Sequence, residues 1–351
     1  MKQPAERRIL GFVAVALLVL ITAGLAAGAG PGNAPVFKRL SNGLVNYQLS
    51  TFFGPCKKMY TVYEFQAHRA DAWAQSTAKE VNVYGKSHCL KVINQDAGGY
   101  QNVSKQLDQL DAAIAKKPDA IILWTTDPTA VAGAVDKARA QGIKVIGFVA
   151  PPKATTDALV SGDWHIDGGL MVHAIATKIG KKGDVLAIWG GAGGSYQTDL
   201  TAGAAKAAKS YPNVKMITKT IADFDPAKVQ TLVEDELTRN PNLKGVITSI
   251  AVMASGAADA IEVAGAKGKV FTVSGLLGSK ANVADIKTGR IGFMVGVPSV
   301  VYAREVVIVT ANLLNGKAYP KKTIIPGQVF TAGNISTPGA LKWELRPEFL
   351  K

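Results

Sequence analysis

The stretch GGAGGS, residues 190–195, places a glycine-rich turn directly after the apolar run Val185–Trp189. A strand that leads through glycines into a helix can hold a nucleotide phosphate on its backbone N–H groups. The dinucleotide pattern G-x-G-x-x-G does not fit, because Tyr196 stands where the last glycine is required. The next predicted strand, VKMITKT, also lacks the terminal acid that would bind a ribose. A nucleotide-dependent exported enzyme is therefore the least favoured interpretation.

Residues that could act as nucleophiles or metal ligands lack a catalytic spacing. Ser195 and Ser255 lie next to glycines, but neither belongs to a G-x-S-x-G nucleophile pattern. The 4 histidines include no pair at the spacing of a metal site on one helix, and 2 cysteines are too few for a thiolate centre. We therefore expect no enzyme activity, no metal and no cofactor.

The two cysteines are predicted to form a structural disulfide. Cys56 precedes the apolar run MYTVYEF, and Cys89 begins the run CLKVINQ. If these runs are neighbouring parallel strands, both cysteines lie at the same edge of the sheet, within the short separation that a disulfide requires. Such bridges are typical of exported chains.

The N-terminus has the three-part pattern of a secretory signal peptide. Arg7 and Arg8 precede the apolar run Ile9–Leu20, which ends in the small residues TAGLAAGAGPG. We expect cleavage near Ala29, so residues 1–29 are the predicted signal peptide and the mature chain is expected in the periplasm. The alternative is an uncleaved anchor, because the apolar stretch approaches the roughly 20 residues that span a bilayer.

The chain is strongly basic, and its formal net charge of +14 falls to +12 once three basic residues and one acid are removed with residues 1–29. The lysines are spread in pairs such as Lys57-Lys58 and Lys321-Lys322, without a long basic run or interleaved aromatic residues. Nucleic-acid binding usually needs a concentrated basic patch. We therefore expect a solvated basic surface and no nucleic-acid partner.

The remaining chain alternates apolar, strand-like runs with helix-length segments. This alternation predicts an α/β fold with parallel sheets, and the chain length predicts two domains. The segment 150–164 contains prolines and lacks a helical period, so we interpret it as a break between two lobes. The apolar runs are Tyr60–Phe65, Leu90–Asn94, Ala120–Trp124, Ile143–Val149, Val185–Trp189, Val214–Ile217, Gly245–Ser249, Val270–Ser274 and Ile291–Val297.

Several longer stretches occur in an order and spacing typical of one protein family. They are PDAIILWTTDPTAVAGAVDKARAQGIKVI, GDWHIDGGLMVHAIATKIGKKGDV, ADFDPAKVQTLVEDELTRNPNLKGVIT, AADAIEVAGAKGKVFTVSG and IKTGRIGFMVGVPSVVYAREVV. Together they resemble the type I periplasmic solute-binding proteins of ABC transporters, in particular the ribose-binding-like subgroup. The resemblance covers about residues 58–330.

The resemblance implies two Rossmann-like lobes with parallel sheets, joined by a three-crossing hinge. It places residues 30–57 in an N-terminal extension, 58–161 plus 298–325 in the N-terminal lobe, and 162–297 plus 326–351 in the C-terminal lobe. The implied function is to capture a small solute between the lobes and deliver it to an ABC transporter membrane permease. The resemblance also implies that the protein is a monomer. A ligand sensor of the same fold that signals to a membrane histidine kinase is the alternative.

The positions that bind sugar in this family have mostly lost their polar side chains in this sequence. By the resemblance they correspond to Val149 with Ala150, Thr198, Ile250 with Ala251, Leu276 and Val297, while the aromatic Phe224 is kept. Removing a sugar hydroxyl from water without a replacement partner costs about 1–3 kcal/mol. We therefore expect these residues to line a site for a compact, weakly hydroxylated solute rather than an ordinary sugar.

Polar and aromatic residues near other predicted strand ends complete the candidate binding site. They are Glu64, Gln66 and Arg69 after the first strand, Trp124 and Asp127 after the third, and Trp164 and Tyr196 at the edge of the second lobe, with His68 as a further candidate. We expect a polar end of the solute to lie near Glu64, Gln66 or Arg69, against walls from the aromatic residues.

Structural roles are open for several of these residues. Asp127 is alternatively a helix cap, Trp124 a core residue and Trp164 a residue that packs the hinge. Glu64 and Arg69 could pair with each other instead of binding a charged group on the solute.

Overall fold

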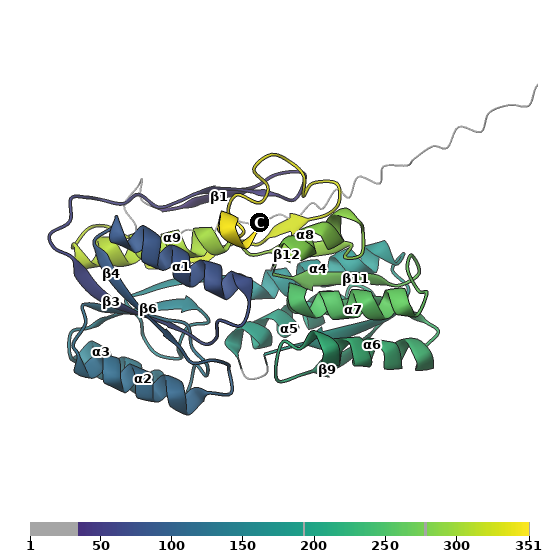
Figure 1. Cartoon of the computed structure of the whole chain (residues 1–351), viewed down its shortest axis with the longest axis horizontal. Coiled ribbons are helices and arrows are strands. Elements are labelled where there is room, and N and C mark those ends of the chain that lie inside the picture. Colours follow the sequence, from purple (N-terminus) through teal and green to yellow (C-terminus); the bar gives the residue numbers. More distant parts are fainter. Residues whose placement is uncertain (1–33, 192–193, 277–278, 351) are drawn as a thin grey trace, which may run out of the picture.

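In the computed structural model, which describes residues 34–191, 194–276 and 279–350, the chain folds around two six-stranded sheets (Figure 1). The first sheet contains, in spatial order, β13 (Lys322–Ile325), β7 (Ala158–Gly162), β6 (Lys144–Val149), β5 (Ala120–Leu123), β3 (Tyr60–Gln66) and β4 (Leu90–Asp96), all parallel. The second contains β14 (Gln328–Phe330), β12 (Phe293–Gly296), β11 (Phe271–Gly275), β10 (Leu243–Thr248), β8 (Gly183–Trp189) and β9 (Val214–Thr220), with β14 antiparallel to β12. The predicted α/β fold with parallel sheets is confirmed.

Helices cover both faces of each sheet. Because the central strands are buried on both faces, they are continuous apolar runs such as Ala120–Leu123. α1 and α9 cover one face of the first sheet and α2 and α3 the other, while α4 and α5 lie opposite α6 and α7 across the second (Figure 1). Their bounds are α1 Ala72–Lys86, α2 Val103–Ala115, α3 Ala132–Ala140, α4 Trp164–Lys178, α5 Ser195–Ala208, α6 Pro226–Arg239, α7 Ala251–Val263, α8 Lys280–Lys287 and α9 Ser299–Leu314, followed by the 3-10 helix Pro347–Phe349.

The chain passes from the first sheet to the second after β7, returns after β12 and passes over again between β13 and β14. Residues 150–164, interpreted from the sequence as a break, contain β7. The backbone of β7 pairs with β6 and β13, and its Ala158 and Val160 are buried. This segment is therefore a strand of the first sheet as well as the start of a passage between the sheets.

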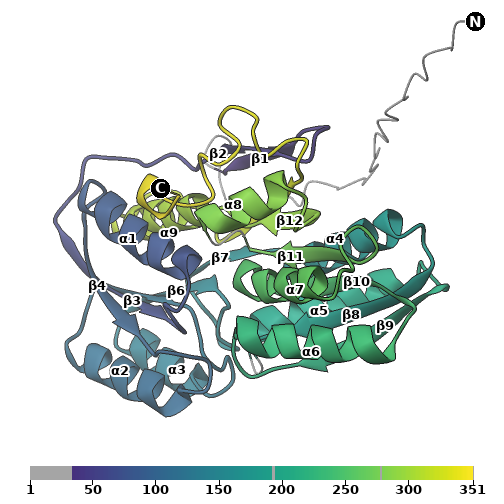
Figure 2. The same cartoon turned by 45° about the vertical axis from the view of Figure 1, so that its right-hand side comes forward.

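The N-terminal extension, whose role the sequence leaves open, connects the two halves of the molecule. It forms a hairpin of β1 (Val36–Arg39) and β2 (Val45–Gln48) next to β14, where Val329 N–H donates to Gly43 O at 2.9 Å. The following residues run along α9, and Phe53 N–H donates to Asn312 Oδ1 at 3.0 Å. Figure 2 shows the hairpin above the second sheet and the segment after it reaching the first.

The predicted signal peptide, residues 1–29, lies outside the described residues. Among the helices that the structure describes, none is both long enough and apolar enough to cross a membrane.

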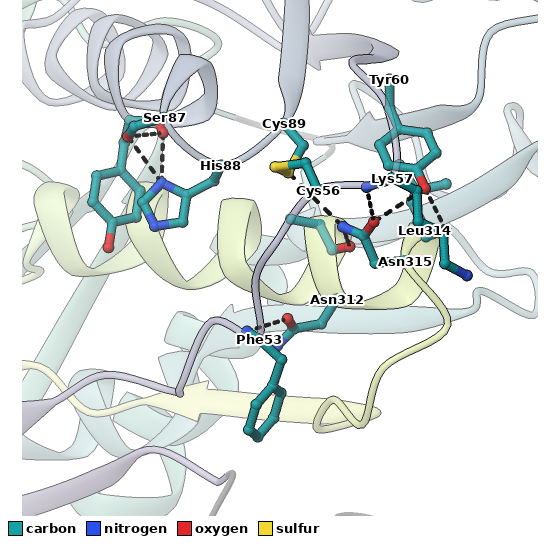
Figure 3. Close-up of a disulfide and its surroundings, with 12 residues drawn as sticks. Phe53, Cys56, Lys57, Tyr60, Ser87, His88, Cys89, Asn312, Leu314 and Asn315 are labelled. Carbon is teal, nitrogen blue, oxygen red and sulfur yellow. Dashed lines mark hydrogen bonds between the residues drawn. A yellow bond between two sulfur atoms is a disulfide. The ribbon is translucent and has the colours of Figure 1, made fainter.

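The predicted disulfide between Cys56 and Cys89 is confirmed (Figure 3). The two Cα atoms are 5.7 Å apart, within the usual range for a disulfide. Cys89 directly precedes β4, and its carbonyl accepts a hydrogen bond from the N–H of Tyr60, the first residue of β3, at 2.7 Å. The two cysteines therefore lie at the same edge of the first sheet, as the sequence predicts.

The backbones of α4 and α5 approach each other closely at two glycines. A Cβ atom added to Gly168 of α4 would lie 2.0 Å from Leu200 O of α5, and one added to Gly203 would lie 1.8 Å from His165 O. Real Cβ atoms do not approach backbone oxygens so closely, so only glycine fits these positions without moving the helices apart. The adjacent Gly169 is different, because its added Cβ would lie 3.7 Å from Ala207 Cβ.

Gly168→Ala is therefore expected to lower the free energy of unfolding by about 1–3 kcal/mol through overpacking. Gly169→Ala, one residue along the same helix, is expected to raise it by about 0.5–1 kcal/mol, because alanine has the higher helix propensity. Urea unfolding of both variants measures the difference. Equal stability of the two variants would show that the α4–α5 contact is not as close as described.

Candidate functional site

A cavity lies where the carboxyl ends of the strands of the two sheets meet. Ligand crevices of open parallel sheets occur at these strand ends, because the loops that follow them converge there. The first side is formed by residues of the loops after β3, β4 and β5, the start of α1 and the end of β6. The other side is formed by residues from α4, α5 and the loops after β9, β10 and β11. The lining residues are His68, Asp71, Trp73, Tyr100, Trp124, Val149, Trp164, Tyr196, Phe224, Ile250 and Leu276.

Aromatic side chains from the two sides contact each other across this cavity. The ring centroids of His68 and Phe224 are 5.4 Å apart, and those of Tyr100 and Phe224 are 6.3 Å apart. The remaining void has a volume of about 20 Å³, which is room for about one water molecule. A larger solute therefore requires the two sides to move apart.

Most polar atoms of the aromatic lining already have partners within the protein. Trp73 Nε1 donates to Val297 O at 2.6 Å, and Trp164 Nε1 donates to Val149 O at 3.1 Å. Trp124 Nε1 donates to Tyr100 Oη at 3.2 Å, and Tyr196 Oη donates to Ser249 O at 3.0 Å. A bound solute would therefore contact these residues mainly through their apolar faces.

His68 and Asp71 are the titratable groups that lie together in this lining. Asp71 caps α1 by accepting a hydrogen bond from Ala74 N–H at 2.8 Å, and its second carboxylate oxygen lies 3.8 Å from His68 Nδ1. Burial lowers the pKa of His68, while Asp71 and Asp96 oppose this shift. Ala70 N–H donates to His68 Nδ1 at 3.4 Å, so the ring nitrogen nearest to Asp71 is an acceptor and does not offset the Asp71 carboxylate. Neither here nor in any other described part of residues 34–350 could three His, Cys, Asp or Glu side chains together hold a metal ion.

The family model for the periplasmic binding protein domain matches residues 66–318. The chain belongs to this periplasmic binding protein family.

Curated relatives of this periplasmic binding protein are named for small carbohydrates and polyols. The ribose import binding protein of Bacillus subtilis is 28% identical over 272 residues, which cover 77% of this chain and 87% of the relative. The xylitol-binding protein of Mycolicibacterium smegmatis is 24% identical over 212 residues, 60% of this chain and 59% of the relative.

Solved structures of binding proteins share the fold. A solute-binding protein from Agrobacterium vitis with bound α-D-tagatopyranose has a TM-score of 0.75 and 23% identity, and the match covers 82% of this chain and 99% of that one. A solute-binding protein from Bradyrhizobium with bound bis-tris has a TM-score of 0.71 and 24% identity, covering 94% of this chain and 99% of that one. The type I binding-protein fold is therefore established for the described part of the chain.

Two lining residues of this binding protein have left-handed backbones without being glycine. Val149 has φ +56° and Leu276 has φ +43°. Such conformations are rare for a branched side chain such as valine and cost about 1–3 kcal/mol each. At Val149 the carbonyl accepts hydrogen bonds from Ser161 Oγ at 2.5 Å and from Trp164 Nε1, so the strained backbone connects the end of β6 to the start of α4.

The structure brings together Trp124, Val149, Trp164, Tyr196, Phe224, Ile250 and Leu276 from the predicted site. It places the expected polar end, Glu64, Gln66 and Arg69, outside the lining. Arg69 Nε donates to Gln66 Oε1 at 2.9 Å, and Arg69 Nη2 lies 3.6 Å from a carboxylate oxygen of Glu64. Glu64 also accepts a hydrogen bond from Asn94 at 2.7 Å. The alternative in which Glu64 and Arg69 pair with each other is the one observed.

Three further predicted residues lie outside the cavity lining and have structural contacts. Asp127 accepts hydrogen bonds from Thr129 N–H at 2.7 Å and Ala130 N–H at 2.8 Å in the turn before α3, but it is not the cap of that helix, whose N-cap is Val131. Thr198 Oγ1 donates to Gly194 O at 3.2 Å within the first turn of α5. Val297 contributes its carbonyl to Trp73 and is itself buried.

Sequence reasoning missed Asp71, Trp73 and Tyr100 as lining residues. Asp71 and Trp73 belong to the same loop and helix start as His68, and Tyr100 follows β4. Their positions in the sequence are one signal for the cavity edge, because each of them follows a strand of the parallel sheet within a few residues. The capping position of Asp71 before the helix AWAQSTAKE was a second signal.

Proposed function

We propose that this protein is a periplasmic receptor that captures a small solute between two lobes and delivers it to an ABC transporter permease. The lobes in this proposal are residues 58–161 plus 298–325 and residues 162–297 plus 326–351, with 1–29 removed as a signal peptide. The single observation that supports it most is the cavity between the two sets of strand ends, closed by aromatic contacts across it. A solute that binds the closed arrangement more tightly than the open one shifts the protein toward the closed arrangement. The size of the shift is set by the difference between the two affinities.

The lining favours a compact, weakly hydroxylated solute. A sugar needs directional partners for many hydroxyl groups, and each unpaired buried group costs about 1–3 kcal/mol. Val149, Ile250 and Leu276 offer no polar side-chain atoms, and the indole N–H groups are already bound within the protein. The solute is therefore held mainly by contacts with apolar walls.

A sugar or polyol is the second candidate, and the names of the relatives favour it. The ribose import binding protein and the xylitol-binding protein are named for such solutes. For this chain to bind one, the solute would have to find its partners among His68, Asp71 and Tyr100, which retain hydrogen-bonding capacity in the cavity.

A thermal-shift panel of sugars, polyols, amines, small acids and aromatic metabolites distinguishes the candidates. A solute that binds only the folded state stabilises it by about 2.7 kcal/mol at a concentration 100-fold above its Kd. We expect an apolar or amine solute to give the largest shift. A larger shift with ribose or xylitol would support the second candidate instead.

Phe224→Ala is expected to weaken binding of the solute that gives the largest shift by about tenfold or more, because a buried aromatic contact contributes about 1.5–3 kcal/mol. Isothermal titration of the variant measures this loss. Tyr211→Ala is the matched control, because Tyr211 follows α5 at its opposite end and hydrogen-bonds His173 rather than lining the cavity. Unchanged affinity in Phe224→Ala would show that the solute binds elsewhere.

A further inference from the structure

Among the described residues that line the cavity, Asp71 is the only acidic one, and none is a lysine or arginine. One of its oxygens caps α1, and the other lies 3.8 Å from His68 Nδ1, which accepts a hydrogen bond from Ala70 N–H. Burial chiefly raises the pKa of Tyr100, and the negative charge of Asp71 adds to that rise. The negative charge of Asp71 thus acts on Tyr100, and no lysine or arginine among the described lining residues balances it.

Aromatic rings surround His68, the side chain that lies 3.8 Å from Asp71. Tyr100, Trp124 and Phe224 pack around His68 at centroid distances of 4.9 to 5.5 Å. Trp73, two residues after Asp71, packs edge-on against Trp124 at 5.8 Å. The electron-rich faces of such rings attract cations, most strongly where water is excluded.

We propose that the cavity binds a small organic ammonium ion, with Asp71 as its counter-ion and the faces of Trp73, Tyr100, Trp124 and Phe224 as its cation–π partners. This inference rests on the proposed function, because it names the class of solute that the receptor captures.

The distribution of hydrogen-bonding groups supports a cation over a neutral polyol. An ammonium ion needs negative charge and aromatic faces, which the cavity supplies, and it requires no hydrogen-bond donor from the protein. A polyol needs several donors, but the indole N–H groups of Trp73, Trp124 and Trp164 already donate to Val297 O, Tyr100 Oη and Val149 O, which leaves His68 and Tyr100. An alkyl-substituted ammonium would also fill the apolar positions at Ile250 and Leu276.

The test is isothermal titration of the purified full-length protein with tetramethylammonium, choline and ethanolamine. The neutral carbon isostere of choline, 3,3-dimethylbutan-1-ol, has the same shape without the charge and is titrated in parallel. We expect at least one cation to bind and the isostere to bind at least about tenfold more weakly than choline. Binding by none of the three cations, or equal binding of choline and its isostere, overturns the inference.

Asp71→Asn tests the counter-ion directly, because asparagine is as good an N-cap as aspartate and preserves the start of α1. We expect it to weaken cation binding at least about tenfold through loss of the charge. Asp225→Asn is the matched control, because Asp225 is exposed and caps α6 through Ala227 N–H and Lys228 N–H. The cation affinity of Asp225→Asn is expected to stay within about twofold of the wild-type affinity.

The outcomes separate this inference from the function on which it rests. If ribose or xylitol binds in the same titration and no cation does, solute capture stands and the ammonium assignment is wrong. If Asp71→Asn binds the cation as tightly as the wild type, Asp71 is not the counter-ion and the inference is also wrong. If neither cations nor neutral solutes of the thermal-shift panel bind, the proposed receptor function itself fails.

Discussion

Replacing Asp167 with asparagine is expected to remove much of the loss of stability that the wild-type protein undergoes between about pH 5 and pH 8. Asp167 lies on α4 and is 3% exposed, next to Gly327, where the chain passes between β13 and β14. Burial raises the pKa of its carboxyl to about 8, while Arg39 opposes this rise and Asp163 adds to it. Folding therefore favours the protonated form of this group.

A carboxyl with a higher pKa in the folded than in the unfolded chain binds its proton more tightly when folded. The stability that it contributes is fully present below the unfolded pKa of about 4 and is lost as the pH rises through the folded value of about 8. Within this window one such group changes the free energy of unfolding by about 1.4 kcal/mol per pH unit, or about 4 kcal/mol from pH 5 to pH 8. Urea unfolding at several pH values, followed by tryptophan fluorescence, measures the slope.

Asparagine has nearly the shape of protonated aspartate and does not ionise. The free energy of unfolding of Asp167→Asn should therefore equal that of the wild type at low pH and exceed it at pH 8. Burial also raises the pKa values of Glu64, Glu305 and Glu344, so only the difference between the two proteins reports Asp167. Asp235→Asn, at an exposed position of α6, is the control. Parallel slopes for Asp167→Asn and the wild type would contradict the prediction.

The central strands were predictable from the sequence because their signal is local. Strands such as β5 and β10 are apolar runs between turn signals, and burial on both faces leaves few polar residues in them. The edge strands β13 and β14 were not found. Each has four residues or fewer, and each is held by long-range pairing, β13 with β7 and β14 with β12. No local period identifies such short strands.

The candidate site was predictable in its location but not in its polar groups. Residues that directly follow a strand in the sequence lie at the edge of the cavity, as Trp124 and Phe224 do. It does not indicate the direction of the side chain. Glu64 and Gln66 lie within β3, which continues to Gln66, one residue past its predicted end, and Arg69 turns back to contact them. That ion pair depends on tertiary contacts with β4, such as Asn94, that the sequence does not reveal.

Removing the disulfide with the double substitution Cys56→Ala and Cys89→Ala is expected to lower the free energy of unfolding by about 3–4 kcal/mol. The bridge joins residues separated by 33 positions. On the chain-entropy model it restricts the unfolded chain, and a closed loop of this length gives an effect of that size. Urea unfolding under oxidising conditions measures the loss. Adding dithiothreitol should bring the wild type down to the variant and leave the variant unchanged.

The native structure should change little when this bridge is removed, because hydrogen bonds hold the same segment independently. Lys57 N–H donates to Asn315 Oδ1 at 3.1 Å, and Tyr60 Oη donates to the same oxygen at 3.2 Å (Figure 3). Phe53 N–H likewise remains bound to Asn312 of α9. The double variant is therefore expected to retain native fluorescence and solute affinity while unfolding at lower urea. A loss of less than about 1 kcal/mol would contradict the chain-entropy account, and a loss of solute affinity would show that the bridge also positions the first sheet.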